Sequence, residues 1–81
     1  MTMLYRDALG IVLKELRTEQ GLILREVANK SYISYGYLSE IERGKKEVTS
    51  GVMYWLCEAL GTNVPDVLDR VSTLMRERVT V

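Results

Sequence analysis

The feature that most constrains the fold is a series of short segments in which hydrophobic residues recur every three or four positions. This spacing is that of one buried face of an α-helix. Residues that commonly begin or end helices separate the segments. They are Ser34, Thr49 and Asn63 at the starts and Gly21, Gly44 and Gly61 at the ends. The pattern predicts an all-α domain of five helices with short connections.

We expect these helices at about residues 4–20, 24–30, 34–44, 49–61 and 64–78, with Pro65 in the first turn of the last one. A chain of 81 residues is large enough for one modest core and too small for two. The expectation is therefore a single domain over residues 1–81, without a separate sensor domain.

Composition removes several function classes. The chain has no histidine, which is the commonest general base and a common metal ligand. Cys57 is the only cysteine, so an internal disulfide cannot form, and its helical position favours a buried apolar role over a nucleophile. No charge-free apolar run approaches the length of about 18 residues that a membrane span requires. We expect a cytoplasmic protein that is not an enzyme and uses no metal, cofactor, small-molecule ligand or membrane.

The stretch from Leu22 to Gly44 resembles the helix-turn-helix of Cro/cI-like, or Xre-type, regulators. The shared features are Ala28 in the first of its two helices, an aliphatic residue and Ser34 in the turn, and the closing Tyr-Leu-Ser-Glu-Ile-Glu-Arg-Gly. Within that family, the Leu-Arg-Glu-Val and Gly-Tyr-Leu-Ser-Glu-Ile-Glu-Arg-Gly-Lys-Lys-Glu segments are most similar to those of the actinobacterial Clp-protease gene regulators. The resemblance implies a five-helix, lambda-repressor-like domain with its helix-turn-helix at about residues 23–43, an extended C-terminal helix, and a role in transcription regulation.

The second helix of this motif has two distinct faces. At 100° per residue, Leu38 and Ile41 point to one side of the helix. The residues that point to the other side are expected to contact bases in the major groove of double-stranded DNA. They are Tyr35, Gly36, Ser39 and Glu40. Two alternatives stay open: Tyr35 as a solvated aromatic side chain, and Glu40 in a salt bridge with Arg43.

Basic and polar residues around this helix are the expected contacts to the DNA phosphates, which position a protein on DNA without specifying sequence. They are Arg25, Ser34, Tyr37, Arg43, Lys45 and Lys46. For Arg25, an ion pair with an acidic neighbour in its own helix is the alternative. The resemblance also implies that Arg17 and Glu42 form a buried structural ion pair.

The chain departs from the family at two places. Ile23 and Leu24 occupy the positions where the family usually has a Ser or Thr cap and a Gln that contacts DNA. Tyr32 occupies the turn position where glycine is usual, and a left-handed backbone would cost it about 1–2 kcal/mol. The turn is therefore expected either to bear that cost or to differ locally.

The last predicted helix is longer than the domain requires. Its stripe of Val71, Leu74 and Met75, with Trp55 nearby, is expected to form a two-fold dimer interface that places two recognition helices on a palindromic operator. The alternative is that these residues fill the core of one protomer.

The formal net charge of zero keeps a second function class open: a protein-interaction module of the same fold that has lost DNA binding. RNA polymerase or a protease is a further candidate partner. The sequence does not distinguish an activator from a repressor.

Overall fold

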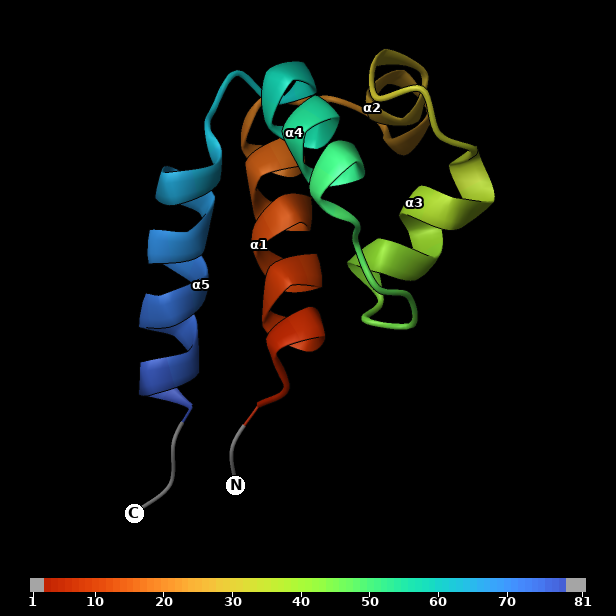
Figure 1. Ribbon diagram of the computed structural model, residues 1–81. Helices are drawn as coiled ribbons and strands as arrows, with labels where there is room; N and C mark the ends of the chain where they lie inside the picture. Colours follow the sequence, from red (N-terminus) through yellow and green to blue (C-terminus); the bar gives the residue numbers. More distant parts are fainter. Residues whose placement is uncertain (1–2, 79–81) are drawn as a thin grey trace.

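The computed structural model describes residues 3–78. Over this range the secondary structure consists of five α-helices without strands, as predicted: α1 (Tyr5–Glu19), α2 (Leu24–Lys30), α3 (Tyr35–Glu42), α4 (Ser50–Ala59) and α5 (Val64–Glu77). In Figure 1, α1 lies in the middle of the molecule, α5 runs antiparallel beside it, and α2 and α3 lie on its other side. Among the residues described, no helix combines the length and the apolar character needed to cross a membrane.

The predicted capping residues begin three of the helices. The side-chain oxygen of Ser34 accepts a hydrogen bond from the backbone N–H of Tyr37 at 3.1 Å. Thr49 begins α4 and Asn63 begins α5 in the same way. These caps satisfy backbone donors that have no partner within the helix, and they explain why the predicted bounds agree with the structure to within about two residues.

The start of α2 is different, because Ile23 has no side-chain acceptor to offer. Instead, the carboxylate of Glu26 accepts the backbone N–H of Ile23 at 2.9 Å. The acidic group at this helix end also complements the helix dipole. The start of α2 therefore has the carboxylate contact of a capping box but no side-chain acceptor at the N-cap.

The core is formed by apolar residues from all five helices. The buried members are Ala8, Leu9, Val12, Leu13, Val27, Ala28, Leu38, Ile41, Met53, Leu56, Cys57, Leu60, Val67 and Val71. Burial raises the pKa of the Cys57 thiol, which keeps it in its less reactive protonated form. Ala28 is 1% exposed at the junction of α2 and α3, where its small side chain lets the two helices pack closely.

Gly10 allows α1 to approach the end of α3 closely. A Cβ atom at this position would lie 2.5 Å from the carbonyl oxygen of Ile41 and 2.7 Å from that of Glu42. Glycine in a helix interior costs about 1 kcal/mol relative to alanine, so its presence here has a packing reason.

Tyr32 keeps the left-handed conformation of the turn, with φ of +60°. Of the two outcomes expected from the sequence, the first is observed: the turn keeps its left-handed backbone at Tyr32 despite the free-energy cost of that conformation. The residue is 75% exposed, so burial of this side chain does not compensate for the strain.

The predicted dimer stripe on α5 is largely used inside the protomer. Val71 is 2% exposed and belongs to the core, so its assignment to an interface is wrong. Leu74 and Met75 are half-buried and pack against that core. Leu74 and Met75, in the turn after Val71, therefore extend the packing of α5 against the core.

Candidate nucleic-acid interface

Helix α3 has the two faces that its sequence predicts. Leu38 and Ile41 are each 1% exposed and anchor the helix to the core. On the opposite face, Tyr35 and Gly36 are exposed, and Ser39 and Glu40 are half-buried. One face is therefore fixed by packing. The other presents an aromatic ring, a hydroxyl, a carboxylate and, at Gly36, backbone without a side chain.

An ion pair joins α1 to the end of α3. Arg17 donates from Nε to Oε2 of Glu42 at 2.8 Å and from Nη2 to Oε1 at 3.0 Å. Its Nη1 donates to the carbonyl oxygen of Leu22 at 2.9 Å. The hydrogen bonds to Glu42 raise the pKa of the Arg17 guanidinium. The pair is thus a structural clamp that fixes α3 relative to α1 and to the loop before α2.

Arg25 lies over the ring of Tyr35, with its Cζ 5.5 Å from the ring centroid. A guanidinium on an aromatic face is a favourable cation–π arrangement. This contact joins the first turn of α2 to the first turn of α3. Among the residues described, Arg25 forms no ion pair with an acidic neighbour, and Tyr35 carries the guanidinium on its ring while the residue stays 53% exposed.

Internal contacts fix the basic loop that follows α3. Gly44 adopts φ of +74°, and the N–H of Lys45 donates to the carbonyl oxygen of Glu40 at 2.8 Å. The hydroxyl of Tyr37 donates to the carbonyl oxygen of Glu47 at 3.0 Å, and Arg6 pairs with the Glu47 carboxylate. Tyr37 therefore uses its hydroxyl proton within the protein, where the sequence suggested a phosphate contact.

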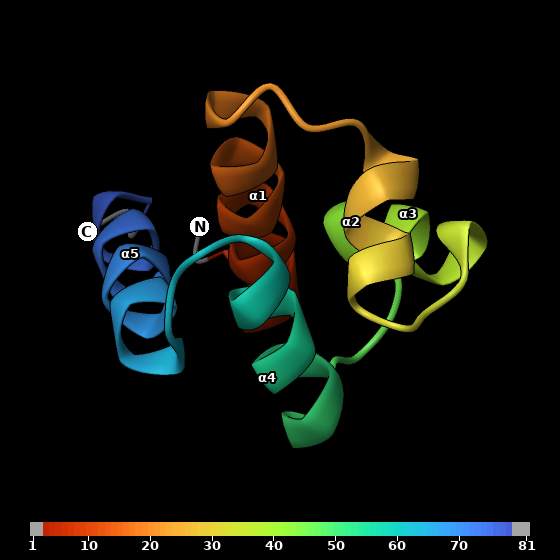
Figure 2. The same cartoon turned by 90° about the horizontal axis from the view of Figure 1, so that it is seen from above.

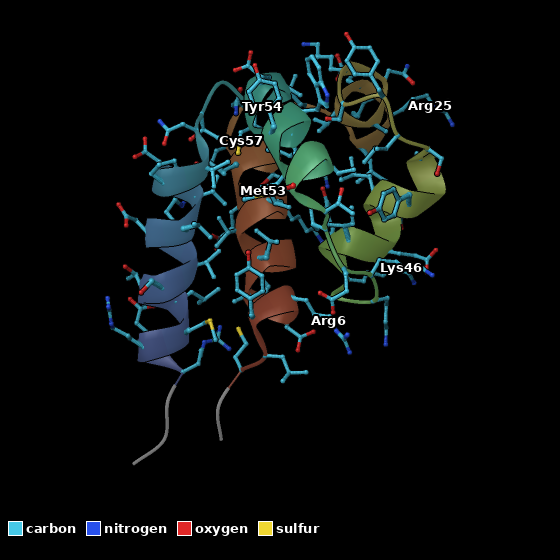
Figure 3. All side chains as sticks on the ribbon, in the orientation of Figure 1. Arg6, Arg25, Lys46, Met53, Tyr54 and Cys57 are labelled. Carbon is cyan, nitrogen blue, oxygen red and sulfur yellow. The ribbon has the colours of Figure 1, made fainter. Side chains whose placement is uncertain are left out.

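The exposed cations extend along the side of the molecule that carries α3. Figure 3 shows Arg25 and Lys46 on this side, with α3 between them. Arg43 donates from Nε to the carbonyl oxygen of Ser39 at 3.4 Å. No ion pair joins Arg43 to Glu40 within residues 3–78, so the alternative of a salt bridge is absent there. The Glu40 carboxylate is left to accept from a partner on the exposed side.

Comparison with known proteins agrees with this geometry. A family model described as helix-turn-helix matches residues 13–67. The chain belongs to this helix-turn-helix family. Its match of 48% identity to the transcriptional regulator ClgR of Mycobacterium tuberculosis extends over 60 residues, 74% of this chain and 54% of the relative. The chain spans about half the length of the curated relatives it matches.

Solved structures of helix-turn-helix proteins share the fold. The clp gene regulator ClgR from Corynebacterium glutamicum superimposes with a TM-score of 0.93 at 45% identity, covering 96% of this chain and 83% of that one. The restriction-modification controller protein C.Esp1396I, solved as a tetramer with its natural 35 base-pair operator, superimposes with a TM-score of 0.83, covering 91% of this chain and 97% of that one. At 20% identity, the second comparison supports the fold alone. The expected resemblance to Xre-type, Clp-gene regulators is confirmed.

Sequence reasoning missed a pocket between α1 and the exposed face of α3. We call it the α1–α3 pocket; it is lined by Lys14, Arg17, Leu24, Tyr35, Ser39, Glu42 and Arg43. Lys14 lies three residues before Arg17, so the two side chains share one face of α1. This spacing could have indicated that Lys14 lies beside Arg17. It points to the pocket only once Glu42 is known to pair with Arg17.

Trp55, which the sequence predicts near a dimer interface, lies at the centre of an aromatic patch with Tyr32 and Tyr54, two partners that were not predicted. The ring centroid of Trp55 lies 5.0 Å from that of Tyr32 and 5.1 Å from that of Tyr54, both in edge-to-face geometry. All three residues are at least 42% exposed. Seen from above, the turn after α2 lies beside α4, which brings these residues together (Figure 2).

Proposed function

We propose that this chain regulates bacterial transcription by binding double-stranded DNA as a homodimer on a palindromic operator, with α3 in the major groove. DNA as the partner places the protein in the cytoplasm. The observation that carries the proposal is the two-faced α3, whose outer residues are Tyr35, Gly36, Ser39 and Glu40. A helix of this width fits the major groove, where each base pair presents a distinct set of donors and acceptors.

The proposed base contacts follow from the chemistry of the exposed groups. The Ser39 hydroxyl both donates and accepts, whereas the ionised Glu40 only accepts and would favour the amino group of cytosine. Tyr35, held by Arg25, would pack on a sugar or on a thymine methyl group. Gly36 would let the helix backbone approach the DNA.

Phosphate contacts would come from residues at both ends of the recognition helix. Arg25 lies near its start, and Arg43, Lys45 and Lys46 follow its end. The hydroxyl of Ser34 caps the helix and would also lie near the backbone of the DNA. The start of α2 would contribute less, because Ile23 and Leu24 are apolar and Glu26 is acidic.

We place the aromatic patch at the centre of the interface between protomers. It is a cluster of large exposed rings, and aromatic residues are enriched at protein interfaces. A second copy is the proposed partner because Tyr32 belongs to the helix-turn-helix itself, so a two-fold contact there would bring two such motifs together on one DNA. Leu74 and Met75 would contribute at most their exposed halves.

Selection of bound duplexes from a random DNA pool tests the proposal. The expected result is enrichment of a palindrome whose half-sites lie about one helical turn, 10–10.5 base pairs, apart. Binding to the enriched duplex should weaken steeply with salt, because phosphate contacts release counterions. Sedimentation of the free protein should show a species of twice the 9.3 kDa protomer mass at micromolar concentration.

Two outcomes would contradict the proposal. Enrichment of a single half-site, with a 9.3 kDa species in solution, would exclude the dimer and keep DNA binding. Absence of any salt-dependent binding, even at low ionic strength, would favour the alternative of an interaction module that has lost DNA binding.

A further inference from the structure

The α1–α3 pocket lies between the Arg17–Glu42 clamp and the exposed face of α3. Arg17 and Glu42 form its floor, because their side chains are only 13% and 6% exposed. Leu24 and Tyr35 line its sides, whereas Lys14 and Arg43 are exposed and stand at its rim. Its volume is about 280 Å³. Since one water molecule takes about 30 Å³ of liquid volume, the space suits a group of several non-hydrogen atoms.

The charge of the pocket is positive once its internal pair is set aside. Both carboxylate oxygens of Glu42 accept from Arg17, so the charges of this pair compensate each other. In the part of the chain that the structure describes, neither Lys14 nor Arg43 forms an ion pair. The rim therefore offers two cations, together with the hydroxyl groups of Tyr35 and Ser39, to a ligand that enters from solvent.

We infer that the α1–α3 pocket seats a phosphodiester group of the DNA backbone, held between the Lys14 ammonium and the Arg43 guanidinium. Tyr35 and Ser39 line the pocket and also belong to the proposed base-contacting face of α3. A backbone phosphate in the pocket would thus be continuous with the bases that α3 contacts. The inference rests on the proposed DNA binding and adds a contact from α1.

The pocket would also supply the attraction for a phosphate that the start of α2 lacks. The Leu24 side chain has no polar group. The Glu26 carboxylate accepts the N–H of Ile23 and would repel a phosphate placed there. An ammonium group on α1 supplies the missing attraction from the neighbouring helix. Because Lys14 is exposed, this contact would cost little desolvation.

The test compares Lys14→Gln with the wild-type protein on the operator duplex selected above, over a range of salt concentrations. Each phosphate contact contributes about 0.9 to the slope of log K against log salt, which corresponds to about eightfold in affinity at 0.1 M salt. We expect Lys14→Gln to reduce the magnitude of the slope by about 0.9 and the affinity by about eightfold. Lys14→Arg, which keeps the positive charge, should retain the wild-type slope and affinity. Arg76→Gln, the same charge change in the last turn of α5, is the control and should alter neither.

A scan of single methylphosphonate linkages, which are neutral, locates the contact. One linkage should weaken binding of the wild-type protein more than binding of Lys14→Gln, since the variant has already lost one of the two cations that the phosphate meets. Identical salt slopes for wild type and Lys14→Gln would overturn the pocket assignment while leaving DNA binding intact. Failure of the wild-type protein to bind any duplex would instead overturn the proposed function on which the assignment rests.

Inorganic phosphate, titrated at constant ionic strength, distinguishes a DNA contact from a site for a free anion. The expected result is that it shifts the amide resonances around Tyr35 only weakly and competes poorly with the duplex. Tight binding of inorganic phosphate, combined with Lys14-independent DNA binding, would assign the pocket to a free anion and overturn the inference.

Discussion

The guanidinium of Arg17 holds the carboxylate of Glu42 through two parallel hydrogen bonds, and this single contact connects the first helix to the end of the recognition helix. The Nη1 of Arg17 also donates to the carbonyl oxygen of Leu22, in the loop before α2. Three segments that are separate in the sequence are thus fixed by one side chain. The position of α3 relative to α1 depends on this pair as well as on the apolar core.

Removing either Arg17 or Glu42 should leave the other charge without a counterion at a nearly buried position. We expect Arg17→Ala to lower the free energy of unfolding by about 3–5 kcal/mol, because breaking a buried pair leaves an uncompensated ion. The matched control is Arg70→Ala, which removes the exposed pairs to Glu15 and Glu19 and should cost about 1 kcal/mol or less. Urea unfolding followed by circular dichroism measures both. Equal losses in the two variants would contradict a buried clamp.

Gly10→Ala should destabilise the protein although alanine is the better helix former. The added Cβ would meet the carbonyl oxygens of Ile41 and Glu42, which are backbone atoms and cannot rotate away. We expect a loss of about 1–3 kcal/mol from this overpacking. Gly51→Ala is the control, because its Cβ would meet no atom within 4 Å, and it should be neutral or stabilising by up to about 1 kcal/mol. Thermal melts of both variants check the opposite signs.

The helix bounds were predictable because they depend on local chemistry. Ser34, Thr49 and Asn63 accept backbone donors three residues ahead, and glycines occupy the left-handed positions after three of the helices. The two faces of α3 follow from helical spacing alone. The Arg17–Glu42 pair was expected only through the family resemblance, since 25 residues separate its members.

The features that were not predicted all require knowledge of which helices touch. The need for glycine at position 10 comes from two carbonyl groups of α3. The contact of Arg25 with Tyr35 depends on the angle of the turn, and the pocket position of Lys14 depends on where α3 lies against α1. The assignment of Val71 to an interface failed for the same reason, because periodicity does not show which neighbour covers an apolar stripe.

Tyr32→Asn should separate folding from self-association. Asparagine tolerates the left-handed backbone better than tyrosine, so the lost contact with Trp55 is partly offset and protomer stability should change by no more than about 1 kcal/mol. The dimer dissociation constant, measured by sedimentation, should rise about tenfold, equivalent to about 1.4 kcal/mol. Leu68→Asn, at an exposed position on α5, is the control. A dimer weakened by Leu68→Asn but not by Tyr32→Asn would move the interface to α5.

The contact between α1 and α5 should weaken in acid. Arg70 donates to Glu19, and this hydrogen bond lowers the pKa of the Glu19 carboxyl. Because the folded-state pKa lies below the unfolded value, the stabilisation is present above the unfolded pKa of about 4.3 and is lost as pH falls through the folded value. The difference in unfolding free energy between wild type and Glu19→Gln should therefore be constant near neutral pH and shrink in acid. A difference that grows in acid would contradict the assignment.

Gly36→Ala should have opposite effects on folding and on DNA binding. In the free protein the added Cβ meets no atom within 4 Å, so the better helix former should stabilise α3 by up to about 1 kcal/mol. On the operator, the same methyl group would project from the first turn of α3, where the proposed mode brings the backbone against the bases. We expect affinity to fall about tenfold, or about 1.4 kcal/mol. Gly51→Ala makes the same change at the second residue of α4 and should leave affinity unaltered. Because Gly36→Ala stabilises the fold, a loss of binding could not be attributed to unfolding, whereas unchanged affinity would show that this turn of α3 stays clear of the DNA.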